Sequence, residues 1–198
     1  CGLSVNDMEK AFLSAGADSF ALKPFPCTGS KLRHELLCVL SSGEDRLALA
    51  KKIDIESLEL PDEISVLLVD DDMMLRKLFS RAVKKVEPAW KIQEAASGEA
   101  ALDLVDGEIF DLIFMDQYMS SKQKGLLGTE TVRALRAKGA NGIICGLSAN
   151  DLEGPFISAG AECFRMKPIP CKGNELKWML KEIFYERQAK GCAQPLQG

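Results

Sequence analysis

Acidic, hydroxyl and amino side chains stand directly after short apolar segments of this sequence. They are Asp70, Asp71, Asp72, Asp116, Ser148 and Lys167. Crowded carboxylates repel one another and favour a hard divalent cation such as Mg²⁺, which takes oxygen ligands. A carboxylate beside such a cation can attack phosphorus and become an acyl phosphate. A Lys supplies positive charge to phosphoryl oxygens, and a Ser hydroxyl can donate a hydrogen bond to them. The residue types therefore fit magnesium-dependent phosphoryl transfer, provided that the fold brings them together.

From residue 64 onward, strand and helix patterns alternate, and this alternation predicts a fold that brings these side chains together. Strands are expected at 64–69, 90–95, 111–115, 142–147 and 162–166, and helices at 72–85, 98–105, 129–138, 151–158 and 173–186. Five successive β–α units predict an α/β fold with a doubly wound, five-stranded parallel sheet. In such sheets the functional crevice lies outside the carboxyl ends of the strands, where all of these polar residues are expected.

Residues 64–184 resemble the receiver domain of two-component response regulators, which has a flavodoxin-like fold. Four motifs carry the resemblance, each at the end of an expected strand. They are LLVDDD (67–72), IFMDQYM (113–119), GLSAN (146–150) and FRMKPIP (164–170). Each motif alone is weak evidence, but the four occur together, in order and at fitting spacing. This joint pattern outweighs separate interpretations of the same residues as helix caps, turn residues and strand terminators.

The resemblance implies a role for each chemical group. Asp116 matches the phosphoacceptor, Lys167 the phosphate-contacting lysine, and Ser148 the hydroxyl switch residue. Asp70 and Asp71 match the acidic pair that binds Mg²⁺, with Asp71 the expected direct ligand. Ser148 is equally suited, as is Asn150, to cap the helix expected at 151–158, and a cap and a switch can coexist in one residue.

Three further residues complete the implied site. The backbone carbonyl of Tyr118 matches the third protein ligand of the metal, beside Asp71 and Asp116. Phe164 occupies the position of the aromatic residue that swings inward on activation, although a core aromatic is as good an interpretation. Asp72 is better explained as a negative charge at a helix N-terminus than as a ligand.

The loop after the phosphoacceptor departs from the family pattern. Where receivers carry Met-Pro and later Asp-Gly, this chain has Met119-Ser120 and Leu127-Gly128, with several residues inserted between them. We expect a longer and more basic loop, which could alter partner choice or the lifetime of the phosphoryl group. The change removes no residue that the chemistry requires.

The chain also contains an internal repeat. Residues 1–36 align with residues 145–180 without a gap, and twenty of the 36 positions are identical; unrelated segments would share about two. The first copy keeps Ser4, Phe20 and Lys23 but lacks both acidic elements. Only the second copy can therefore hold a complete site.

The repeat predicts four parts of the chain. They are the C-terminal part of a truncated first receiver (1–40), a linker with some helix (41–63), a complete receiver (64–184) and a tail (185–198). Without the rest of its sheet, the first part is expected to be poorly ordered or to pack against a foreign surface. A neighbouring chain could supply that surface by domain swapping, which makes a homodimer a candidate assembly.

Composition narrows the class of protein further. The formal net charge is −4 and no Lys/Arg block occurs, which argues against nucleic-acid binding. No apolar run approaches the ~18–20 residues of a membrane span. Seven Cys without a CxxC spacing favour reduced thiols in an intracellular, cytoplasmic protein. His34 sits in a sequence like a kinase phosphoacceptor box, but the repeat aligns it with Trp178 on the closing helix, so a phosphodonor role is disfavoured.

These observations favour a phosphoacceptor receiver of a phosphorelay that takes its phosphoryl group from a histidine kinase or a histidine phosphotransfer protein. The resemblance also implies that the site hydrolyses its own acyl phosphate, which leaves its classification as an enzyme open. One alternative is a pseudo-receiver that acts as a phosphorylation-independent interaction module. Another is a metal-dependent phosphohydrolase, which is disfavoured because Tyr118 stands where that class carries a second Asp.

Overall fold

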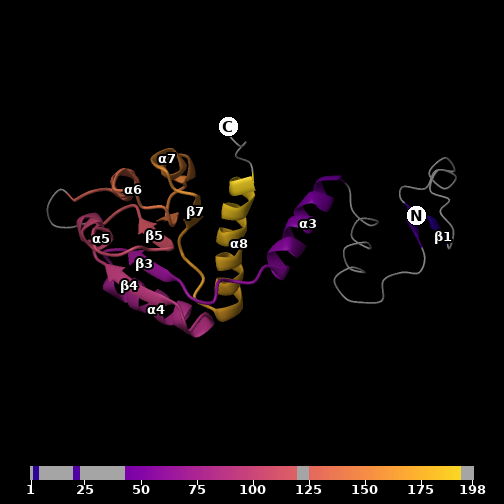
Figure 1. Ribbon diagram of the computed structural model, residues 1–198, viewed down its shortest axis with the longest axis horizontal. Helices are drawn as coiled ribbons and strands as arrows, with labels where there is room; N and C mark the ends of the chain where they lie inside the picture. The colour runs from indigo at the N-terminus through magenta and orange to yellow at the C-terminus, as the bar shows by residue number, and fades with distance from the viewer. Residues whose placement is uncertain (1, 5–19, 23–42, 120–124, 193–198) are drawn as a thin grey trace. The chain divides into compact units, whose positions relative to one another are not determined.

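A computed structural model of the chain describes residues 2–4, 20–22, 43–119 and 125–192. The chain divides into two compact units, Cys1–Leu58 and Glu59–Gly198 (Figure 1). The second unit begins before the expected receiver boundary at Ile64. Leu60 packs against its core, and the indole Nε1 of Trp90 donates a hydrogen bond to the Pro61 carbonyl at 2.8 Å.

The second unit is built on one five-stranded sheet. Its strands are β3 (Ser65–Val69), β4 (Lys91–Ala95), β5 (Leu112–Asp116), β6 (Ile143–Ser148) and β7 (Cys163–Met166). They lie in the order β4-β3-β5-β6-β7 and every pairing is parallel. The predicted doubly wound parallel sheet is therefore confirmed. All residues of β5 are buried, as the uninterrupted apolar run predicts for a central strand covered on both faces.

Helices cover both faces of this sheet. They are α4 (Met73–Val86), α5 (Gly98–Val105), α6 (Gly128–Ala137), α7 (Glu153–Ala159) and α8 (Gly173–Cys192). One core cluster joins the sheet to α4 and α8 through residues such as Phe79 and Leu180, and the other joins it to α5, α6 and α7 through Ala101, Val132 and Phe156. The predicted site residues Asp70, Asp116 and Lys167 stand at or just after the carboxyl ends of β3, β5 and β7.

Two expected helix boundaries differ from the structure. The closing helix ends at Cys192, past the predicted end at Glu186 and well into the predicted tail. The helix expected from Asp151 begins at Glu153, so the predicted caps Ser148 and Asn150 lie too far upstream. Leu152 occupies the N-cap position without a side-chain hydrogen bond.

The first unit contains β1 (Gly2–Ser4), β2 (Phe20–Leu22) and α3 (Gly43–Ser57) among its described residues. The two strands pair in parallel, with Gly2 opposite Phe20. Their repeat equivalents in the second unit, Gly146 and Phe164, stand opposite each other in β6 and β7. Lys23, His34 and the packing expected of residues 1–40 lie outside the described residues.

In the described ranges, no helix is both long enough and apolar enough to cross a membrane. Three cysteines of the second unit are free thiols, Cys145 and Cys163 in the core and Cys171 at the surface.

Candidate functional site

The register of the sheet brings the predicted site residues to one edge. Val69 pairs with Met115, so Asp70 emerges beside the end of β5, where Asp116 stands. Asp116 in turn pairs with Leu147, which places Ser148 one residue beyond it on β6. Lys167 follows the last residue of β7. The strand pairing alone therefore brings these residues to one edge of the sheet, as the sequence predicts.

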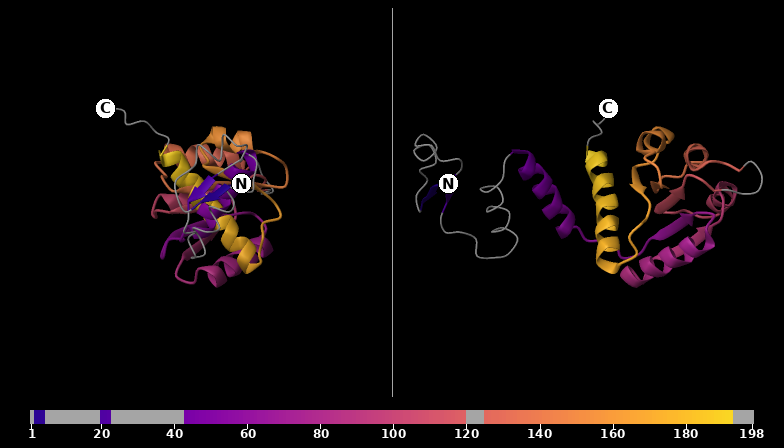
Figure 2. Two further views of the ribbon diagram at one scale, coloured as in Figure 1. Left: turned by 90° about the vertical axis from the view of Figure 1, so that its right-hand side faces the viewer. Right: turned by 180° about the vertical axis from the view of Figure 1, so that it is seen from behind.

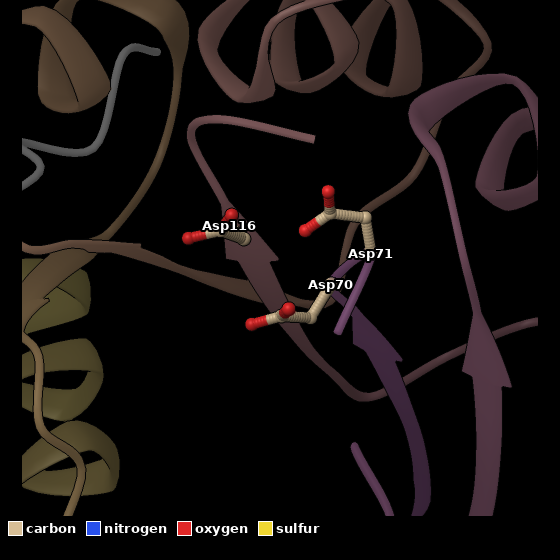
Figure 3. Close-up of side chains that lie close together, drawn as sticks. All are labelled: Asp70, Asp71 and Asp116. Carbon is tan, nitrogen blue, oxygen red and sulfur yellow. The ribbon is translucent and has the colours of Figure 1, made fainter. Parts of the chain in front are cut away.

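Three carboxylates gather at this edge. Asp70, Asp71 and Asp116 each offer an oxygen, and these oxygens lie within 4.8 Å of one another. Figure 3 shows Asp116 at the end of one strand and Asp70 and Asp71 at the end of its neighbour, with the three side chains close together. Asp70 and Asp116 are buried, whereas Asp71 is exposed. An all-oxygen donor set with three negative charges fits a hard divalent cation such as Mg²⁺.

Lys167 bridges the two buried carboxylates. Its Nζ lies 2.6 Å from Asp70 Oδ2 and 2.7 Å from Asp116 Oδ1. Partial burial acts to lower the pKa of Lys167, but hydrogen bonds and charge from Asp116 and Asp70 outweigh it and raise that pKa. Burial raises the pKa of Asp116, because Lys167 offsets the desolvation of this carboxylate only in part and Asp70 adds repulsion.

The start of α4 holds Asp70 in place. The backbone N–H of Asp72 donates to Asp70 Oδ1 at 2.9 Å. The carboxylate of Asp72 accepts from the N–H groups of Met74 and Leu75 at 2.8 and 3.2 Å, which makes Asp72 the N-cap of α4. Its predicted role as a helix N-terminal charge is confirmed. No motif in the sequence points to Arg76, whose guanidinium donates a hydrogen bond to the backbone carbonyl of Asp70.

The predicted switch residues lie inside the unit. Ser148 is 1% exposed, and its Oγ accepts a hydrogen bond from Asn150 N at 3.1 Å. Its carbonyl accepts from Lys167 N at 2.8 Å, which couples the ends of β6 and β7. Phe164 is buried and packs on Phe156, with ring centroids 5.7 Å apart. The Tyr118 side chain is exposed. The switching of Phe164 remains a prediction.

The long loop after Asp116 is closed at its base by residues that sequence analysis did not single out. The carbonyl of Gln117 accepts from Gly128 N at 2.9 Å, and its side-chain Oε1 accepts from Thr129 N at 3.1 Å. Gly128 lies so close to Asp116 that a Cβ at position 128 would stand 2.1 Å from the Asp116 carbonyl oxygen. The first and last residues of the loop are therefore fixed against Asp116. Residues 120–124 of the loop lie outside the described residues.

Gly128→Ala is expected to destabilise the fold because the backbone of Asp116 must move to admit the methyl group. We predict a loss of about 1–3 kcal/mol in the free energy of unfolding, measured by urea titration. Gly154→Ala is the matched control, since nothing lies within 4 Å of a Cβ at that helix position. If the two variants were equally stable, the close approach of Gly128 to Asp116 would not restrict the residue at position 128 to glycine.

This combination of a five-stranded doubly wound sheet with an acid cluster and a lysine at its carboxyl edge defines a receiver-type fold. The sequence profile of the response regulator receiver domain matches residues 66–180, more than half of the chain, and the chain belongs to this family. Receiver domains typically bind Mg²⁺ through an acidic pocket, and the cluster of Asp70, Asp71 and Asp116 stands at that position.

Individual relatives agree with this assignment. The two-component response regulator ORR41 of rice is 32% identical over 111 residues, which cover 54% of this chain and 84% of that protein. The nitrate/nitrite response regulator protein NarL of Escherichia coli is 30% identical over 108 residues, covering 53% of this chain but only 48% of NarL. The structure of chemotaxis response regulator CheY4 of Vibrio cholerae shares the fold, with a TM-score of 0.53 and 24% identity over 61% of this chain and 98% of CheY4.

Proposed function

We propose that the second unit is a working phosphoacceptor in a two-component phosphorelay. Asp116 takes a phosphoryl group from a phosphohistidine carried by a histidine kinase or a histidine phosphotransfer protein. The observation that carries the proposal is the position of Lys167, whose Nζ lies 2.6 and 2.7 Å from two carboxylates of the three-carboxylate cluster. A pseudo-receiver used only for docking would have no need of this costly concentration of buried charge.

The chain's own residues account for the transfer. A carboxylate oxygen of Asp116 attacks phosphorus in line as the P–N bond to the donor imidazole breaks, and the bonding electron pair returns to the imidazole nitrogen, which takes up a proton. Asp70, Asp71, Asp116 and the carbonyl of Tyr118 would hold Mg²⁺, which would supply positive charge to the phosphoryl oxygens. Lys167 already contacts Asp116 and remains beside the new phosphoryl group as a second cation.

The phosphoryl group then changes the face formed by the last strands. It carries about −1.5 to −2 charge, which attracts the Ser148 hydroxyl and keeps Lys167 engaged. Because Ser148 and Lys167 are hydrogen-bonded through their backbones, a shift of one moves the other and the strand that carries Phe164. Water attack on the acyl phosphate at the same site reverses the change, so a magnesium-dependent autophosphatase activity belongs to this proposal.

A tandem arrangement is part of the proposal. We interpret residues 1–40 as the end of another receiver, residues 41–63 as a linker, residues 64–184 as the working receiver, and the remaining residues as a tail. Two observations support it: the repeated sequence, and the pairing of β1 with β2 in the register of β6 with β7. We further propose a cytoplasmic location, supported by the absence of any CxxC spacing among seven Cys, and self-association through the first unit.

Intact mass after incubation with acetyl phosphate tests the proposed function. The parent is expected to gain one phosphoryl group in the presence of Mg²⁺ and none when Mg²⁺ is chelated. Asp116→Asn is expected to gain none under either condition. A folded parent that binds Mg²⁺ but takes up no phosphoryl group from acetyl phosphate or from any phosphohistidine donor would favour the pseudo-receiver.

A further inference from the structure

Helix α6 begins without a capping side chain of its own. Its N-cap residue is Leu127, whose side chain has no atom that can accept a hydrogen bond. The first backbone N–H groups of a helix have no acceptor within the helix, and a Ser, Thr, Asp or Asn at the N-cap normally supplies one. At the start of α6 the acceptors must therefore come from other residues.

Gln117 supplies two of these acceptors. Its carbonyl accepts from Gly128 N at 2.9 Å, and its side-chain Oε1 accepts from Thr129 N at 3.1 Å. Its own N–H donates to the Leu147 carbonyl on β6 at 3.0 Å. Gln117 is 6% exposed, and a buried amide is tolerated where its polar atoms are hydrogen-bonded. The residue that follows Asp116 is therefore tied to β6 on one side and to the start of α6 on the other.

Two glutamates bind the neighbouring N–H groups. Glu99, in the first turn of α5, accepts from Leu126 N at 2.9 Å, and Glu130 accepts from Leu127 N at 2.9 Å. Figure 2 shows α5 and α6 on the same side of the sheet, where both contribute to one core cluster. The glutamate acceptors thus lie on helices. Only Gln117 connects the start of α6 to the end of β5.

The place of Gln117 in the chain gives this connection a consequence for the site. Gln117 stands between Asp116, whose carboxylate belongs to the acid cluster, and Tyr118, whose backbone carbonyl is the third proposed protein ligand of Mg²⁺. A backbone carbonyl has no side-chain torsion of its own, so the neighbouring backbone sets its direction. Removing a polar group that orients metal ligands typically weakens metal binding by about 10–100-fold. The hydrogen bonds of Gln117 should therefore be reflected in the affinity for Mg²⁺.

We infer that Gln117 is a positioning residue of the magnesium site, because its side chain fixes the backbone between Asp116 and Tyr118 by bonding the start of α6. The inference rests on the proposed function and adds a residue outside the proposed ligands. The same amide completes the cap that Leu127 cannot provide. One side chain thus serves both the helix and the site.

Gln117→Met tests the inference because it keeps the length of the side chain and removes the acceptor. Calorimetric titration of the full chain with magnesium chloride is expected to show about tenfold weaker binding than in the parent. Gln93→Met is the matched control, with the same chemical change in the same sheet at a side chain that bonds Glu108. It should bind Mg²⁺ as the parent does. Unchanged affinity in Gln117→Met, or a parent that binds no Mg²⁺, overturns the inference.

A second variant separates positioning of the site from capping of the helix. Leu127→Asn gives α6 a neutral N-cap side chain at a position that is 40% exposed. Added to Gln117→Met, it is expected to restore stability in urea but to leave Mg²⁺ binding about tenfold weak. If the affinity returns together with the stability, Gln117 acts only as a helix cap and the inference is wrong.

Uptake from acetyl phosphate separates this inference from the proposed function. At low Mg²⁺ concentration Gln117→Met is expected to react about tenfold more slowly than the parent, and saturating Mg²⁺ should restore its rate because every ligand is still present. A rate that stays low in saturating Mg²⁺ would place the effect outside metal binding and overturn the inference. If the parent binds Mg²⁺ but accepts no phosphoryl group, the proposed function fails, while the titration still decides the role of Gln117.

Discussion

In magnesium-free buffer at neutral pH, Asp116→Asn is expected to unfold at a higher temperature than the parent. Burial raises the pKa of Asp116, and repulsion from Asp70 adds to the rise, so the ionised carboxylate costs stability. An amide of the same size removes that cost. We expect a gain of about 1 kcal/mol, or several degrees in Tm. Asp103→Asn, at an exposed position of α5, is the control and should leave Tm unchanged.

The pH dependence of this difference follows from the direction of the pKa shift. The folded-state pKa of Asp116 lies above its usual value of 3.8, so the folded chain binds this proton more tightly than the unfolded chain does. The loss of folding stability caused by the ionised Asp116 carboxylate is complete above the folded-state pKa. It disappears as the pH falls through that pKa. The Tm gap between Asp116→Asn and the parent should therefore narrow on acidification toward about pH 4. A gap that widens would contradict the assigned shift.

Lys167→Met is expected to have the opposite effect on stability. It leaves Asp70 and Asp116 buried without the ammonium that bridges them. Because Lys167 is itself partly exposed, we expect a loss of about 2 kcal/mol in the free energy of unfolding, measured in urea without Mg²⁺. Lys172→Met, at a side chain that is 86% exposed, is the control and should be near neutral.

Two further measurements check the cause of that loss. Adding Asp70→Asn to Lys167→Met should restore part of the stability, because one of the two unpaired charges is removed. Mg²⁺ should stabilise Lys167→Met more than it stabilises the parent, since the cation then replaces the missing positive charge. If Lys167→Met is as stable as Lys172→Met, the Lys167 ammonium does not compensate the buried negative charges of Asp70 and Asp116, and this account of the loss is wrong.

The convergence of the site could be predicted because it depends on strand ends. Apolar runs locate the strands, and parallel strands place Asp70, Asp116, Ser148 and Lys167 on one edge whatever the details of the loops. Asp72 could be assigned as a cap for a similar reason, since its position just before a helical pattern decides its role. These inferences need only the order and spacing of residues along the chain.

Contacts between backbone segments far apart in sequence could not be predicted in this way. The need for Gly128 arises because its Cα approaches the Asp116 carbonyl across the loop, and Gln117 closes the same loop through its side chain. The predicted end of α8 was too early because it was placed where the apolar stripe stops. Residues 187–190 add nothing to that stripe, but their high helix propensity lets the helix continue. The start of α7 was missed because Leu152 precedes it without a side-chain cap.

The measurement that tests the central claim most directly is the chemical location of the phosphoryl group. After incubation with acetyl phosphate and Mg²⁺, borohydride reduces an aspartyl phosphate to homoserine, and peptide mass spectrometry locates the reduced residue. We predict conversion of Asp116 alone, abolished when Mg²⁺ is chelated. Reduction at another carboxylate, with Asp116 unmodified, would contradict the assignment of Asp116 as the phosphoacceptor.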